Sequence, residues 1–155
     1  MHARLREEYQ TKYKKNLMEQ FKYSTVMQVP KIEKIVLNVG VGDGNSNPNY
    51  LNSVVTELTA ITGQKAVKTV ARKSIANFKI REGYEVGCRV TLRGNKMYEF
   101  LERMIHVALP RVRDFKGLSS KSFDTYGNYN FSIMEQIIFP EINFDQTEKI
   151  HGINV

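Results

Sequence analysis

The sequence predicts an α+β fold in which helices pack against one face of a sheet. The runs Lys31–Gly44 and Tyr84–Gly94 alternate with period two, which is typical of strands with one face on the core and one in water. After an N-terminal helix, the patterns follow in the order β-α-β-β-α-β-β. The chain has 155 residues, 41% hydrophobic and 25% charged, so we expect one folded domain over residues 1–155.

An amphipathic helix is expected at the N-terminus, because apolar residues recur there every four positions with Arg, Lys and Glu between them. This stripe consists of Leu5, Tyr9, Tyr13, Leu17 and Phe21. We expect it to pack on the core, and a surface that stacks bases is the alternative. The segment Met27–Pro30 breaks the pattern before the first strand.

The two alternating runs place different chemistry on their two faces. The apolar sides hold Ile35, Leu37, Val39 and Val41 in the first run, and Tyr84, Val86, Cys88, Val90 and Leu92 in the second. The opposite sides hold Lys34, Val36, Asn38 and Gly40, and Glu85, Gly87, Arg89, Thr91 and Arg93. Amide, hydroxyl and guanidinium groups can bind a polyanion, and glycine admits close approach of another backbone. We therefore expect this face to dock nucleic acid.

The other elements follow from caps and breakers. A helix over Leu51–Ile61 is preceded by Asn45–Pro48, which offers a cap and a first-turn proline, and is ended by Gly63. A short strand over Lys65–Val70 then leads into a basic loop over Ala71–Gly83.

A third helix, after the N-terminal helix and the helix over Leu51–Ile61, is expected to begin after Gly94 and to end at Pro110. Its inward positions are expected to be Met97, Leu101, Met104, Ile105 and Ala108, and His106 is expected to pack in the core. A basic connection over residues 111–130 precedes two further expected strands, Phe131–Phe139 and Lys149–Val155. A connection of that length inside a compact domain is usually functional.

Positive charge is concentrated in the middle of the chain, within a net charge of +7. Residues 1–64 carry 8 basic and 6 acidic side chains (+2), residues 65–121 carry 14 and 5 (+9), and residues 122–155 carry 1 and 5 (−4). The basic middle favours an acidic partner, and the acidic tail indicates a second partner surface of other chemistry. Chance clustering on a solvated surface is the alternative.

Motifs for catalysis, metals and membranes are lacking. Gly40–Gly44 has the glycines of a phosphate loop, but no Gly-Lys-Ser/Thr follows. Cys88, the single cysteine, is expected to be a buried, inert thiol. His2 and His151 have no metal-ligand spacing, the carboxylates form no acid–base pair, and no apolar run reaches 18 residues. We expect no catalytic residue, metal, cofactor, small-molecule substrate or membrane contact.

Seven blocks of sequence occur in a characteristic order: Val29–Gly42, Thr62–Lys65, Arg72–Ala76, Arg81–Gly83, Arg89–Gly94, Leu109–Phe115 and Glu135–Ile142. Together they resemble the ribosomal protein L5 family, the 5S-rRNA-binding proteins of the large ribosomal subunit. The resemblance implies a concave antiparallel sheet with helices behind it and an open RNA-binding face. It also implies a non-enzymatic protein in the central protuberance of a cytoplasmic bacterial ribosome, or of a ribosome in an organellar matrix or stroma.

The implied partners are 5S rRNA, large-subunit rRNA, the peptidyl-site tRNA and a small-subunit head protein. Family contacts to 5S rRNA carry over onto Lys34, Asn38, Gln64 and Thr91, and the strand alternation adds Arg89 and Arg93. The segment that resembles the tRNA-contacting loop contains Arg72, Lys73, Ser74, Asn77 and Lys79. The intersubunit bridge is expected to involve Arg111, Arg113, Glu141 and Asp145.

The family continues past the position of Val155 into the rest of a strand and a terminal helix, so this sequence is expected to be incomplete or truncated. Two rival functions stay open. One is a small enzyme that acts on a phosphorylated substrate at the Gly40–Gly44 turn. The other is a free-standing RNA chaperone that binds many RNAs equally.

Overall fold

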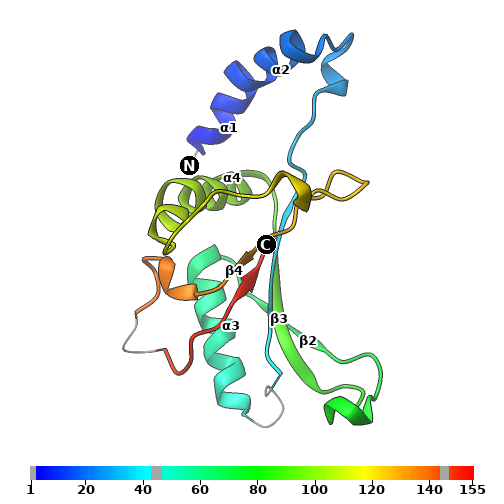
Figure 1. Cartoon of the computed structure of the whole chain (residues 1–155). Helices are drawn as coiled ribbons and strands as arrows, with labels where there is room; N and C mark the ends of the chain where they lie inside the picture. Colours follow the sequence, from blue (N-terminus) through cyan, green and yellow to red (C-terminus); the bar gives the residue numbers. More distant parts are fainter. Residues whose placement is uncertain (1–2, 43–46, 144–146) are drawn as a thin grey trace.

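The computed structural model describes residues 3–42, 47–143 and 147–155. A five-stranded sheet in the order β2-β3-β1-β5-β4 forms its centre, and every strand pair is antiparallel (Figure 1). The strands are β1 (Ile35–Gly40), β2 (Val67–Val70), β3 (Glu85–Leu92), β4 (Ser132–Ile133) and β5 (Ile153–Asn154). The predicted α+β class is confirmed.

Three helical segments accompany this sheet. The N-terminal one runs through α1 (Arg4–Glu8), the π-helical turn η1 (Tyr9–Tyr13) and α2 (Lys14–Phe21). The others are α3 (Pro48–Thr62) and α4 (Gly94–Arg103), which continues into the π-helical turn η4 (Met104–Ala108). Short 3-10 turns are η2 (Val26–Gln28), η3 (Ala76–Phe78), η5 (Leu109–Arg111), η6 (Ser120–Ser122) and η7 (Gln136–Ile138).

One face of the sheet is covered, because the apolar sides of β1 and β3 share a hydrophobic cluster with α3 and α4. The cluster includes Leu37, Val39, Val90 and Leu92 from the strands, Leu51, Val54, Leu58 and Ile61 from α3, and Met97 and Phe100 from α4. Burying each such side chain contributes about 1.5–3 kcal/mol. Positions of β1 alternate strictly between buried and exposed, so the opposite face stays open, as predicted.

The ends of α3 follow the predicted signals. Asn47 Oδ1 accepts a hydrogen bond from the Tyr50 N–H at 3.2 Å, and Pro48 occupies the first turn. At the other end Gly63 adopts a left-handed conformation (φ 64°) and donates its N–H to the Thr59 carbonyl at 2.9 Å. These caps fix α3 behind the sheet.

Two predictions about the helix that begins after Gly94, observed as α4 and η4, are wrong. Ile105 is 44% exposed, and His106 is exposed instead of packed in the core. The helix passes into the π-helical turn η4 at Met104, and a wider turn changes which positions face inward. Met104 and Ala108 remain buried, as predicted.

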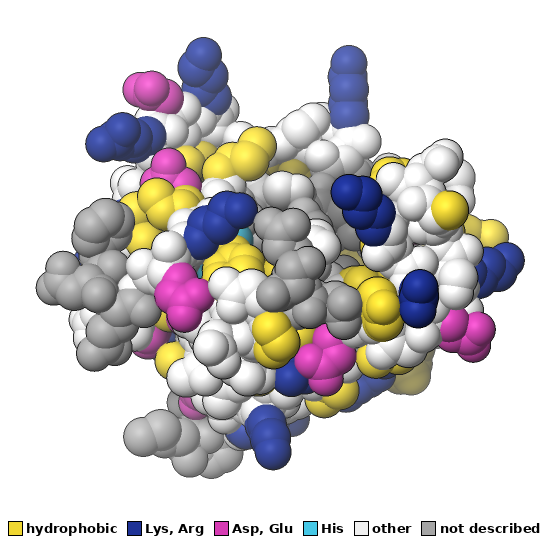
Figure 2. Space-filling model, turned by 90° about the horizontal axis from the view of Figure 1, so that it is seen from below, with side chains coloured by type: hydrophobic (Ala, Val, Ile, Leu, Met, Phe, Trp, Pro, Cys, Tyr) yellow, Lys and Arg dark blue, Asp and Glu magenta, His cyan; other side chains and the backbone are white. Residues whose placement is uncertain are grey.

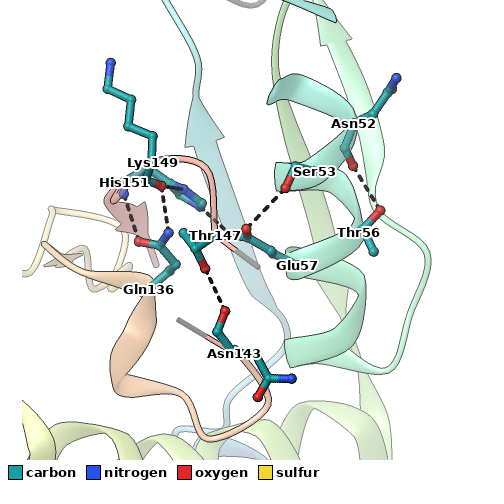
Figure 3. Close-up of polar contacts among 9 residues, drawn as sticks. All are labelled: Asn52, Ser53, Thr56, Glu57, Gln136, Asn143, Thr147, Lys149 and His151. Atoms are coloured by element: carbon teal, nitrogen blue, oxygen red, sulfur yellow. Dashed lines mark hydrogen bonds and ion pairs between the residues drawn. The ribbon is translucent and has the colours of Figure 1, made fainter. Parts of the chain in front are cut away.

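The predicted strand Phe131–Phe139 is also wrong in most of its length, because β4 comprises only Ser132 and Ile133, with Phe131 before it adding backbone hydrogen bonds to Val155. The cause is Gln136, which is fully buried (Figure 3). Its Nε2 donates to the Lys149 carbonyl at 2.9 Å, and its Oε1 accepts from the His151 N–H at 2.8 Å. This amide occupies the backbone groups that lead into β5, and the chain turns through η7.

The prediction that the N-terminal aromatic stripe packs on the core holds only for its first half. Leu5 and Tyr9 pack against the hydrophobic cluster, whereas Tyr13 is 41% and Phe21 is 56% exposed. A repeat of four advances by about 40° around an ideal α-helix at each step. Later members of the stripe therefore turn away from the face that Leu5 occupies.

Candidate nucleic-acid interface

A row of exposed side chains crosses all five strands on the open face. Cross-strand pairing aligns Val67 with Arg89, Arg89 with Asn38, Asn38 with Asn154, and Asn154 with Ser132. All five residues are exposed. With strands about 4.8 Å apart, the row is about 19 Å wide.

Polar groups on this row are already oriented. Ser132 Oγ donates to Asn154 Oδ1 at 2.8 Å, so the Asn154 carbonyl oxygen is engaged and its amide N–H groups point elsewhere. Asn38 stands between this pair and the Arg89 guanidinium. A four-stranded RNA-recognition sheet holds two or three bases, so a row of this width can contact several nucleotides. Among the described residues of the row there is no aromatic ring, so its polar side chains offer charge and hydrogen bonds but no stacking surface.

Adjacent rows on the same face lie two residues away along the strands. Val36 pairs with Thr91 on one side, and Gly40 pairs with Gly87 on the other. A Cβ built at Gly87 would lie 2.3 Å from the Val39 carbonyl oxygen, so only glycine allows β1 and β3 to approach this closely. Glycine at this position therefore serves strand packing.

The other residues predicted to contact 5S rRNA lie at the end of the face nearer α4. Lys34 is exposed just before β1, and Arg93 Nη1 lies 3.8 Å from Glu33 Oε1 in an exposed pair of little energetic weight. Gln64 is half-buried, and its Nε2 donates to the Thr91 carbonyl at 3.0 Å. The Gln64 amide thus binds the backbone at the end of β3.

The predicted tRNA-contacting loop is the tip of the β2–β3 hairpin. An antiparallel bridge between Ile75 and Ile80 closes the tip, Ser74 Oγ accepts from the Glu82 N–H at 2.9 Å, and Lys79 is left-handed (φ 53°). The exposed residues of the tip are Arg72, Lys73, Ser74, Asn77 and Lys79, with Phe78 71% exposed. Figure 2 views the molecule from the end where the hairpin lies, and Lys and Arg side chains there stand beside hydrophobic ones.

The predicted bridge residues do not form one cluster. Arg111 and Arg113 are exposed at the start of the 111–130 connection, but Glu141 is paired with Arg103. Arg103 also donates through Nη2 to the Ile61 carbonyl at 2.9 Å, so this pair ties the segment after η7 to α3. Asp145 lies outside the described residues, as do Asp43 and Gly44 of the glycine-rich turn.

The sequence patterns did not predict two members of the polar row, Asn154 and Ser132. Both lie on strands of two residues, too short for a recognisable alternation. Their register becomes visible only when β5 pairs with β1 at Asn38.

Behind the sheet, His151, just before β5, and Glu57 of α3 lie close together (Figure 3). His151 Nε2 lies 3.7 Å from Glu57 Oε2, and the two side chains are 9% and 13% exposed. Burial raises the pKa of the Glu57 carboxyl and lowers the pKa of the His151 imidazole. Within residues 3–42, 47–143 and 147–155, no group of three His, Cys, Asp or Glu could hold a metal ion.

Two family models match the chain. One is described as ribosomal protein L5 and matches residues 25–81, and the other is described as the ribosomal L5P family C-terminus and matches residues 85–155. A protein of Geobacter sulfurreducens, large ribosomal subunit protein uL5, is 60% identical over 99% of this chain and 86% of its own length. The chain belongs to the ribosomal protein L5 family.

Two further relatives carry the same name. The uL5 proteins of Anaeromyxobacter sp. strain Fw109-5 and Shewanella sp. strain ANA-3 are 55% and 54% identical over 100% and 99% of this chain, and 86% of each relative is covered. As a member of the L5 family, the chain is a structural, non-enzymatic constituent of the large ribosomal subunit and associates with rRNA. The rival reading of an enzyme at the glycine-rich turn is therefore wrong. No helix in the described part of the chain is long and apolar enough to span a membrane.

Proposed function

We propose that this L5-family chain binds 5S rRNA through the open face of its sheet and helps attach it in the central protuberance. The observation that carries this proposal is the row formed by Arg89, Asn38, Asn154 and Ser132. Arg89 neutralises a phosphate, while the amides and the hydroxyl fix the register of the RNA by directional hydrogen bonds. Lys34 and Arg93 extend the positive charge along the same face.

Binding of isolated 5S rRNA, measured over a range of salt concentrations, tests this proposal. Asn38→Ala should weaken binding by about 1–3 kcal/mol, because it leaves a buried polar partner unsatisfied. Arg89→Gln should also reduce the slope of log K against log salt by about 0.7–0.9, the value for one lost phosphate contact. Asn52→Ala, at an exposed position of α3 on the covered side, is the matched control and should bind like wild type.

Equal binding by all three variants would place the RNA elsewhere. Competition with an unrelated RNA of the same length separates attachment from chaperone activity. An attachment protein should prefer 5S rRNA, whereas a chaperone should bind both RNAs equally.

We propose that the hairpin tip contacts tRNA in the peptidyl site. The tip projects from the sheet, carries the four cations Arg72, Lys73, Lys79 and Arg81, and is closed by the Ile75–Ile80 bridge. The double variant Arg72→Ala with Lys73→Ala should weaken tRNA retention in the peptidyl site and spare 5S rRNA binding. Loss of 5S rRNA binding in this variant would mean that tip and sheet form one RNA surface.

We propose that the acidic C-terminal part faces a basic head protein of the small subunit, and that Arg111 and Arg113 of the 111–130 connection contribute separately to the same bridge. Glu148 is exposed, whereas Glu141 is paired with Arg103. Glu148→Lys should therefore weaken subunit association more at low salt than at 0.5 M salt, because salt screens exposed charges. Association equal to wild type at every salt concentration would reduce these carboxylates to solubilising groups.

A further inference from the structure

The end of the N-terminal helix forms an exposed surface that the sheet face and the hairpin tip do not explain. In the described part of the chain, no residue of α2 is buried, and Met27 in the following turn is 89% exposed. Figure 1 shows α2 projecting away from the sheet, on the side opposite to the β2–β3 hairpin. Exposed apolar side chains on a projecting element mark an interaction site.

This helix end has a defined shape. Lys22 takes a left-handed conformation (φ 52°), and the Tyr23 N–H donates to the Met18 carbonyl at 3.2 Å, which reverses the chain after α2. Thr25 and Gln28 then form a capping box around η2. The reversal places the Tyr23 ring against Phe21, with ring centroids 5.7 Å apart and 29° between the planes.

A groove lies between the helix and the chain that returns to the sheet. Its volume is about 370 Å³. Tyr9 lines the groove, and its Oη donates a hydrogen bond to the Pro30 carbonyl at 2.7 Å. The charged residues of the walls are the cations Arg6, Lys14 and Lys31 and one carboxylate, Glu33, and they lie beside the exposed apolar side chains of Met27 and Ile32.

Charge identifies the occupant. Between Tyr9 and Lys31 the chain has five lysines and one acidic residue. Lysine is depleted in the cores of protein–protein interfaces, whereas positive charge interleaved with aromatic rings is typical of surfaces that bind single-stranded nucleic acid.

We propose that the helix-end surface, formed by Tyr13, Lys14, Phe21, Tyr23, Met27 and Lys31, binds an unpaired segment of large-subunit rRNA. A base stacks on the exposed ring of Phe21, which is backed by the half-buried Tyr23, or enters the groove beside Met27, and the lysines contact the flanking phosphates. The inference rests on the established place of the chain in the large subunit. It adds a second RNA site to the 5S rRNA site proposed on the sheet.

Binding of two separate RNAs tests this inference: isolated 5S rRNA, and protein-free large-subunit rRNA. Phe21→Ala with Tyr23→Ala should weaken binding to large-subunit rRNA by about 5- to 150-fold, the loss of one stacked base at 1–3 kcal/mol. Binding to 5S rRNA should change less than twofold. Asn38→Ala on the sheet should give the reverse pattern, so failure of the 5S proposal and failure of this one are distinguishable.

A second variant guards against a folding defect. Lys14→Gln with Lys31→Gln leaves the apolar side chains in place, and it should reduce the salt slope for large-subunit rRNA by about 1.4, two single-strand phosphate contacts. Glu19→Gln, on the exposed surface of the same helix, is the matched control and should leave or slightly strengthen binding. Unchanged affinity and salt slope in both double variants would overturn the proposal.

Crosslinking within assembled large subunits decides between RNA and protein as the occupant. A benzophenone amino acid at position 21 should crosslink to rRNA nucleotides. A crosslink to a ribosomal protein alone would overturn the proposal in favour of a protein interface. The absence of any crosslink, with efficient crosslinking of the same probe at position 38, would also overturn it.

Discussion

Gly87→Ala should separate two strands at the centre of the proposed 5S rRNA face. An alanine Cβ would lie 2.3 Å from the Val39 carbonyl oxygen and 3.2 Å from Thr69 Oγ1. Carbon and carbonyl oxygen in contact normally lie about 3.3–3.6 Å apart, so β1 and β3 must move apart by about 1 Å. Such overpacking costs about 1–3 kcal/mol, and removal of a strand glycine offsets about 0.5–1 kcal/mol of that.

The net expectation is a loss of about 0–2.5 kcal/mol in the free energy of unfolding, which lowers Tm by up to about 10 °C in a domain of this size. Gly40→Ala is the matched control, because Gly40 pairs directly with Gly87 and a Cβ there meets nothing within 4 Å. That variant should keep or raise Tm by about 1–4 °C.

Thermal unfolding followed by circular dichroism measures both variants, and 5S rRNA binding is measured below the transition. Gly87→Ala should also weaken RNA binding, because Arg89 and Asn38 lie in the next row of the same two strands. If both alanine variants unfold at the same temperature, close strand approach is not the reason for glycine at position 87.

Three further predictions concern buried titratable groups. Burial raises the pKa of the Glu57 carboxyl above its ordinary 4.5. The free energy of unfolding of the wild type, measured in urea relative to Glu57→Gln, should therefore fall as pH rises from 4.5 through the raised pKa. A difference between the two proteins that does not change with pH would contradict this. Burial lowers the pKa of the His151 imidazole from 6.5, so the contribution of this residue to the free energy of unfolding should be lost as pH falls below 6.5. The variant His151→Asn should therefore show a flatter dependence of unfolding free energy on pH in that range. Burial raises the pKa of the Cys88 thiol to about 11, so iodoacetamide at pH 8 should modify it only as fast as the protein unfolds; rapid labelling of the folded chain would contradict that expectation.

Local patterns in the sequence determined the elements whose chemistry is local. The alternation of β1 and β3 fixed which side chains face the core, because a strand with one buried face has a period of two. Asn47, Pro48 and Gly63 fixed the ends of α3, since caps depend on residues within one turn. The polar face with Asn38 and Arg89 was therefore predictable, and the L5 resemblance supplied the RNA expected there.

Tertiary contacts decided the rest. Asn154 belongs to the polar row because it pairs with Asn38, and Ser132 belongs to it because it pairs with Asn154. Both residues lie more than 90 positions from Asn38 in the sequence, and two-residue strands carry no pattern of their own. Gln136 turned an apolar segment away from strand geometry by binding the backbone at residues 149 and 151. Hydrophobic periodicity indicates which residues can be buried, whereas the neighbouring elements decide which of them are buried. Phe21, at the end of the aromatic stripe, therefore stays exposed, although the sequence predicted that it packs on the core.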